Sequence, residues 1–76
     1  MMAELPKLSG RAVAKIFERG GWEIARQKGS HIILVKEGSW ATLSVPAHKE
    51  VAPGTLRSLI RASGLTADEF AALAKK

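Results

Sequence analysis

Residues 22–46 read WEIARQKGSHIILVKEGSWATLSVP, and their pattern predicts the central part of the fold. It holds three segments rich in apolar and β-branched residues, which are typical of strands. They are separated by two short breaks, 28–30 and 36–39, with the glycines that tight turns favour. Because short breaks join antiparallel neighbours, we expect a three-stranded antiparallel sheet. The expected strands are about 22–27, 30–36 and 40–45.

The apolar pattern differs along the three expected strands. In the first, alternation places Trp22 and Ile24 on one face and Gln27 on the other. The second is apolar at every position from Ile32 to Val35, so we expect it to be central or covered on both faces. The third is expected to stop before Pro46, which has no amide proton to donate to a ladder.

Helical signals lie on both sides of this sheet along the chain. Ser9 is a good N-cap for a first helix, which Gly20-Gly21 ends. Pro53 suits the first turn of a second helix that ends at Gly64. A capping box over 66–69 then begins a short final helix. This order predicts an α+β fold of two layers, with the helices on one sheet face and the other face exposed or covered by a partner.

Composition narrows the class of protein. The 76 residues have a net charge of +5 and include no cysteine. We expect a single domain, residues 1–76, without disulfides and in a reducing compartment. No apolar stretch approaches the roughly 20 residues that span a bilayer, and residues 1–6 lack a signal-peptide pattern, so we expect a soluble cytoplasmic protein. The positive charge favours a polyanionic partner, nucleic acid first, although a charge of this size also serves solubility.

A row of bases marks the first expected helix. Arg11, Lys15 and Arg19 recur at every fourth position, which places them on one helix face. Such a row could bind phosphates, but a solvated helix face has the same pattern. With Lys7 and Lys28, they are the candidate residues for binding an RNA backbone.

In the stretch KGSHII, residues 28–33, His31 comes just after an expected turn and near the start of an expected strand. An imidazole has an ordinary pKa of about 6.5, so it can accept and donate protons near neutral pH without a metal. RNA supplies its own nucleophile, the 2′-hydroxyl, and a lone histidine can help to deprotonate it. We expect neither a metal nor a cofactor, because the sequence shows no metal-ligand cluster, phosphate loop or dinucleotide fingerprint. A solvated strand histidine is the other interpretation, and the residues by themselves favour it.

Four neighbouring or related residues are candidates to support His31. Gly29 permits close approach of a ligand to the backbone, and Lys28 would offset phosphate charge. Ser30 could bind a phosphate or cap the turn, but adjacent strand side chains point to opposite faces, so it is not expected to form a nucleophile–base pair with His31. His48 is a second candidate proton carrier, and its distance from His31 depends on strand pairing.

Short motifs follow one another from about Leu8 to Leu73. They are Gly20-Gly21-Trp22, Arg26, Gly29-Ser30-His31, Val45-Pro46-Ala47-His48, and Gly54-Thr55-Leu56 leading into Gly64-Leu65-Thr66. In this order they resemble the HicA-type, or YcfA-like, toxins, small mRNA interferases of toxin–antitoxin pairs. The resemblance implies an α-β-β-β-α fold like the double-stranded-RNA-binding domain, to which this chain adds a short C-terminal helix. It also implies metal-independent cleavage of mRNA with His31 as the catalytic residue, and a HicB-type antitoxin that covers the site.

The start of the second expected helix departs from double-stranded-RNA-binding domains, which usually grip the duplex there with a lysine cluster. Here the start is Ala52-Pro53-Gly54-Thr55, and the first base is Arg57. We therefore do not expect duplex binding in that mode. Two other functions stay open from the sequence: a non-catalytic RNA-binding module of the same fold, and an interaction protein whose apolar sheet face joins a partner.

Overall fold

Three helices and three strands follow one another in residues 7–76, the part of the chain that the computed structural model describes. They are α1 (Gly10–Arg19), β1 (Glu23–Lys28), β2 (His31–Val35), β3 (Leu43–Pro46), α2 (Pro53–Ser63) and α3 (Ala67–Ala74). The predicted α+β class is confirmed, and α-β-β-β-α with a short added helix is consistent with the double-stranded-RNA-binding-domain-like fold. Residues 1–6, on which the expectation of no signal peptide rests, lie outside the described part.

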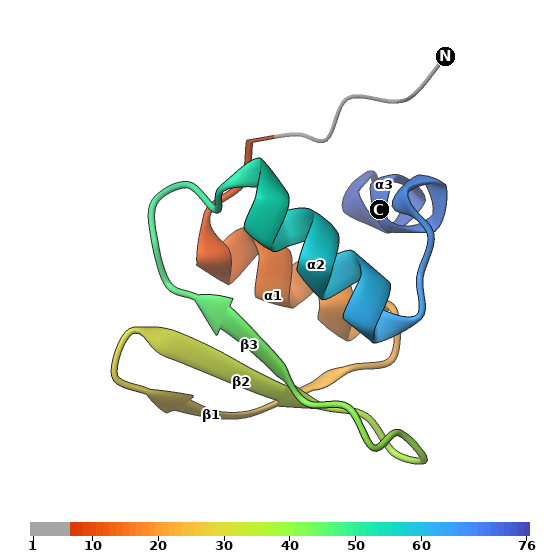
Figure 1. The fold of residues 1–76 in the computed structure, drawn as a ribbon. Helices are drawn as coiled ribbons and strands as arrows, with labels where there is room; N and C mark the ends of the chain where they lie inside the picture. The colour runs from red at the N-terminus through yellow and green to blue at the C-terminus, as the bar shows by residue number, and fades with distance from the viewer. Residues whose placement is uncertain (1–6) are drawn as a thin grey trace.

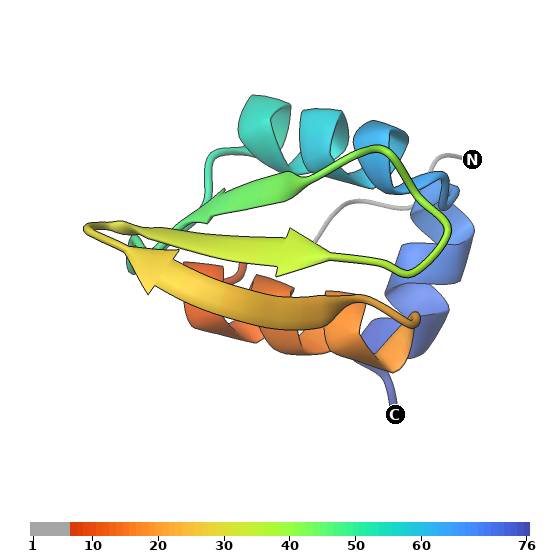
Figure 2. The same ribbon diagram turned by 90° about the horizontal axis from the view of Figure 1, so that it is seen from below.

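The strands form one antiparallel sheet in the order β1-β2-β3, so the apolar strand β2 is central, as predicted. Both α1 and α2 lie on one face of the sheet, and α3 packs against both helices (Figure 1). Figure 2 shows the other face of the sheet with no helix over it. Residues that pair directly across a ladder share a face. This open face therefore consists of Glu23, Arg26, Lys28, His31, Ile33, Val35, Ser44 and Pro46.

Hydrogen bonds confirm the predicted helix ends. The hydroxyl of Ser9 accepts from the amide of Ala12 at 3.2 Å, which caps α1. Thr66 and Glu69 make both bonds of the capping box, at 3.1 and 2.8 Å. Gly64 ends α2 with φ +84°, a left-handed conformation that suits glycine. No helix within residues 7–76 combines the length and the apolar character of a membrane span.

The core lies between the helix layer and the sheet, and α3 closes one end of it. Phe70 of α3 is fully buried, and its ring centroid lies 5.1 Å from that of Phe17 of α1. Tilted aromatic pairs at this separation contribute about 0.5–1.5 kcal/mol beyond the burial of their area. The added helix is therefore part of the core. The other large, fully buried side chains are Val13, Leu34, Leu43, Val45 and Leu56.

The predicted alternation along β1 is wrong at its C-terminal half. A β-bulge between Ile24 and Arg26 shifts the register, so that Gln27 pairs with the buried Ile32. Gln27 therefore lies on the helix side of the sheet with Ile24, not opposite it. A bulge adds one residue to one strand and reverses the facing of those that follow. As a result Arg26 and Lys28 both lie on the open face.

The predicted end of the third strand is also wrong, because β3 includes Pro46, which pairs with His31. Proline is tolerated in an edge strand when the ladder does not need its missing amide proton. Here the next residue provides the bond: the Ala47 amide donates to the Ser30 carbonyl at 2.6 Å. The strand begins at Leu43, later than predicted.

Trp40 lies outside the sheet, in the loop 36–42, although the sequence predicts it as the first residue of a strand. The turn predicted at 36–39 is present, and the Ser39 amide donates to the Lys36 carbonyl at 3.0 Å. The chain then continues past the end of the sheet before β3 begins, as Figure 1 shows. The indole of Trp40 is fully exposed.

The sequence predicts that β2 is central or covered on both faces, and the first of these arrangements is the one observed. Within residues 7–76 the helices cover only one of its faces. Ile32 and Leu34 are buried beneath the helices. On the open face Ile33 is half-buried and Val35 is 39% exposed. The four apolar residues from Ile32 to Val35 place no charged side chain on either face of β2. They do not show that both faces are covered within one chain.

Candidate active site

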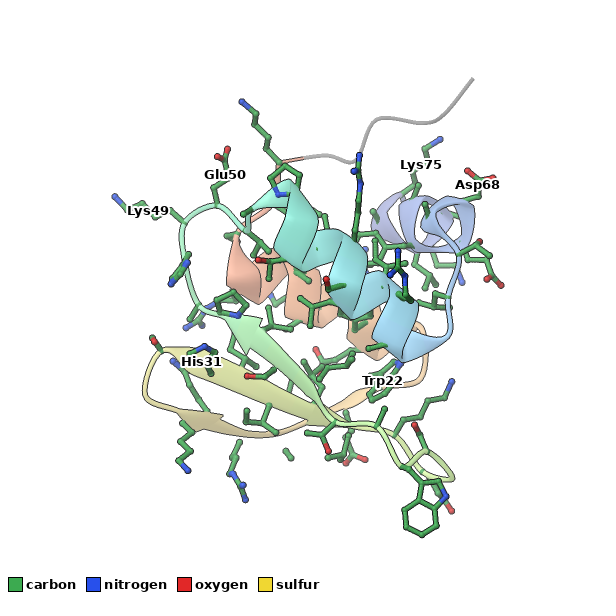
Figure 3. All side chains as sticks on the ribbon, in the orientation of Figure 1. Trp22, His31, Lys49, Glu50, Asp68 and Lys75 are labelled. Carbon is green, nitrogen blue, oxygen red and sulfur yellow. The ribbon has the colours of Figure 1, made fainter. Side chains whose placement is uncertain are left out.

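His31 is the first residue of β2 and lies at one end of the open face. It pairs with Lys28 on β1 and with Pro46 on β3, so its side chain stands between theirs. Directly paired residues have Cβ atoms about 5 Å apart. In Figure 3 His31 lies beside the β1–β2 turn, whereas Trp22 lies near the other end of the sheet. His31 is therefore an exposed strand histidine with a basic residue, Lys28, directly beside it.

A two-residue turn, Gly29-Ser30, delivers His31 to this position. Gly29 has φ +59° and Ser30 does not have a positive φ, as in a type II′ turn. A Cβ placed on Gly29 would meet nothing within 4 Å, so the space beside its backbone is open. A ligand phosphate can therefore approach the main chain immediately before His31.

The segment that follows β3 connects the Gly29-Ser30 turn to the start of α1. Hydrogen bonds join this segment to both. Ala47 donates to the carbonyl of Ser30, and the amide of Gly10 donates to the carbonyl of His48 at 2.9 Å. A Cβ on Gly10 would overlap the carbonyl oxygen of Pro46, so only glycine allows the helix to start this close to the strand. The position of the open-face turn therefore depends on packing on the other side of the sheet.

His48 lies at the same end of the sheet as His31, because it follows by two residues the Pro46 that pairs with His31. Two residues of chain reach at most about 7 Å. The carbonyl of His48 is fixed by its bond from Gly10, and its side chain is exposed. Within residues 7–76 the structure gives no hydrogen bond to either imidazole ring.

The predicted basic residues are not all gathered around His31. Lys28 lies directly beside it, whereas α1 packs on the covered side of the sheet. Lys7 and Arg11 are exposed where α1 starts, at the His31 end, and Lys15 is exposed further along the helix. Arg19 lies about 13 Å beyond the start of α1, from the 1.5 Å rise per residue. There its Nη1 donates to a main-chain carbonyl at the end of α3, at 2.9 Å.

This arrangement offers a proton carrier and a positive charge on one exposed surface. The exposed imidazole of His31 and the exposed side chain of Lys28 are open to solvent and are paired across the β1–β2 ladder. Among residues 7–76, no three His, Cys, Asp or Glu side chains are grouped so that they could hold a metal ion. General acid–base chemistry at a phosphodiester is what these groups can perform.

Sequence reasoning missed the part that Gly10 plays in holding the site. A glycine immediately after an N-cap is unfavourable for a helix unless it has another use, and this was the available signal. Arg26 was noted only as part of a motif. The bulge that brings it to the open face has no sequence signature here.

Comparison with family models identifies one family. The model described as the HicA toxin of bacterial toxin–antitoxin systems matches residues 10–65. No curated protein and no solved structure matches the chain. The matched range runs from α1 to just beyond α2 and contains all three strands, His31 and His48. Because it covers most of the sequence, the chain belongs to the HicA family of toxins from bacterial toxin–antitoxin systems.

Proposed function

We propose that this protein is the toxin of a type II toxin–antitoxin pair and that it cleaves mRNA through His31 without a metal ion. The observation that supports this most directly is the exposed imidazole at the start of β2, paired with Lys28 in a chain of the HicA family.

In the proposed reaction His31 takes the proton of a ribose 2′-hydroxyl, and that oxygen forms a bond to the adjacent phosphorus. The bond from phosphorus to the 5′-oxygen of the next nucleotide breaks. One fragment then ends in a 2′,3′-cyclic phosphate and the other begins with a 5′-hydroxyl. The leaving oxygen takes its proton from a second carrier, for which His48 is the candidate, or from water. Acid–base help of this kind contributes typically 10² to 10⁴ in rate.

The groups around His31 suit the phosphate in this reaction. Lys28 offsets the charge that builds up on the phosphate oxygens in the transition state. The open space at Gly29 admits the phosphate to the backbone, and the exposed hydroxyl of Ser30 is a further donor within the same turn.

The direct test incubates purified protein with an mRNA transcript in the presence of EDTA and maps the ends of the fragments. We expect cleavage to continue and to yield cyclic-phosphate and 5′-hydroxyl ends. Cleavage that stops on chelation would overturn the metal-independent mechanism. RNA that is bound but stays intact would identify a non-catalytic RNA-binding module instead.

Substitution Lys28→Ala is expected to weaken RNA binding and to reduce its dependence on salt. One lost phosphate contact lowers the magnitude of the slope of log K against log salt by about 0.7 for a single strand. The matched control is Lys75→Ala, which removes the same charge from the residue that follows α3, far from His31 in Figure 3. Titration of RNA at several salt concentrations measures both slopes. Equal slopes for the two variants would show that Lys28 makes no phosphate contact.

Membership in the HicA family implies an antitoxin partner in a toxin–antitoxin pair. We propose that this partner is a HicB-type antitoxin and that it covers the open face, where the half-exposed Ile33 and Val35 offer apolar surface around a charged site. A partner placed there would block access to His31 and so inhibit cleavage. With mRNA as its substrate, the toxin acts in the cytoplasm.

A further inference from the structure

The side chain of Trp40 is the most exposed large apolar group in residues 7–76. It is 102% exposed, whereas Trp22, the other tryptophan of the chain, is 3% exposed. An isolated exposed leucine or valine is ordinary, but a fully exposed indole is a large apolar group that gains no stability from burial. Tryptophan is enriched at surfaces that bind another molecule.

The loop 36–42 places Trp40 at the opposite end of β2 from His31. The loop leaves the end of β2 and extends past the sheet, as Figures 1 and 2 show. From His31 to Val35 the strand rises about 13 Å, at about 3.3 Å per residue. The proposed cleavage site and the loop that carries the exposed indole therefore lie at the two ends of β2. Between them, the open-face residues of β1 and β2 form a strip that runs from Lys28 and His31 to Glu23 and Val35.

The charge of this strip is complementary to a nucleic-acid backbone. The β1 bulge brings Arg26 opposite Ile33 and Lys28 opposite His31, so both basic side chains lie along the strip. Glu23, the carboxylate among the open-face residues, pairs with Val35 near the Trp40 end. Basic side chains that could contact phosphates therefore lie at the His31 end and along the middle of the strip. An aromatic ring is available beyond them, at the other end.

From this placement we infer that a single-stranded segment of RNA lies along the open face, with a scissile phosphate at His31 and an unpaired base stacked on Trp40. The inference rests on the proposed function, because it describes how the substrate of that reaction is held. Base–aromatic stacking is the common way in which proteins bind single strands, and it tolerates any base because each has a π-face.

Duplex RNA does not fit these observations. Its bases are already stacked on one another, so none is free to stack on an indole at the protein surface. The start of α2, Pro53-Gly54-Thr55, has no lysine or arginine that would hold a duplex phosphate. Attack by the 2′-hydroxyl also requires the attacking and leaving oxygens to lie roughly in line. A single strand can rotate into that geometry.

The test measures binding of a 2′-O-methylated oligoribonucleotide, which has no free 2′-hydroxyl and stays intact whether or not the protein is a ribonuclease. We expect Trp40→Ala to weaken its binding by about 5- to 150-fold, since stacking of one base is worth about 1–3 kcal/mol. Trp40→Phe should retain part of the affinity. Neither change should alter the melting temperature, because the indole is fully exposed. The loss should be equal at all salt concentrations, unlike that of Lys28→Ala.

Tryptophan fluorescence gives an independent measurement on the parent protein. A base stacked on Trp40 should quench its emission, whereas Trp40→Phe leaves only the buried Trp22 and should show little quenching. The same oligonucleotide annealed to its complement should neither quench nor bind as tightly.

Each contrary outcome has a distinct meaning. If the parent cleaves RNA but Trp40→Ala binds and is quenched like the parent, the proposed function stands and the stacking site is overturned. If Trp40→Ala weakens only the binding of an antitoxin, Trp40 is a protein contact and the inference is equally overturned. If the oligonucleotide binds through Trp40 but RNA is never cleaved, the stacking site stands and the proposed function fails. Equal binding of single strand and duplex would overturn the assignment of substrate class.

Discussion

His31→Ala is expected to reduce RNA cleavage by about 100-fold or more, because a general acid–base group contributes typically 10² to 10⁴ in rate. The side chain is exposed on the open face, so its removal should change the free energy of unfolding by no more than about 0.5 kcal/mol. Rates of cleavage with EDTA present and thermal melting curves measure the two effects separately. In cells, expression of the parent should stop growth and degrade mRNA, and expression of the variant should do neither.

His48→Ala is the matched control for this prediction. It removes a second exposed imidazole from the same end of the sheet, but His48 lies beyond the end of β3 and has no lysine or arginine as a strand partner. Water can replace His48 at the leaving oxygen, so we expect a smaller loss of rate than for His31→Ala. Similar loss in both variants would make the two histidines partners in catalysis. Cleavage by His31→Ala at the rate of the parent would remove His31 from the mechanism.

Gly10→Ala is expected to destabilise the fold by about 1–3 kcal/mol, the usual range for a group forced into a packed interior. The new Cβ would overlap the Pro46 carbonyl oxygen and lie 2.9 Å from the Ala47 Cα. These are main-chain atoms, so no side-chain rotation can relieve the overlap. For a domain of this size the melting temperature should fall by about 5–20 °C, which calorimetry can measure.

The same substitution should also lower the cleavage rate below the melting temperature. Pro46 pairs with His31, and Ala47 donates to the Ser30 carbonyl, so a shift of this segment displaces the turn before the candidate catalytic residue. A displacement of about 1 Å at an active site can cost about 100-fold in rate.

Gly54→Ala provides the control for helix propensity. It makes the same chemical change in the first turn of α2, where a Cβ would meet nothing within 4 Å. Alanine is the better helix former, so stability should stay the same or rise by up to about 1 kcal/mol. If Gly10→Ala and Gly54→Ala melted alike, the close packing of α1 against the end of β3 would not matter for stability.

The helix ends and the first hairpin turn followed from the sequence because they depend on local chemistry. Ser9 and the capping box at 66–69 bond to amides within three residues, and a glycine at position 29 is what a two-residue turn requires. The candidate site was recognised in the same way, from short motifs around His31 and His48. What such motifs do not contain is the distance between segments that are remote in the chain.

Sequence alone thus determined the order of the elements, the central place of β2 and the family to which the chain belongs. Tertiary structure decided which face of β2 is open, how the β1 bulge brings Arg26 to that face, and why Gly10 must be glycine. The physical reason is that pairing register and close packing arise between distant segments, and a shift of one residue in a strand reverses every side chain beyond it.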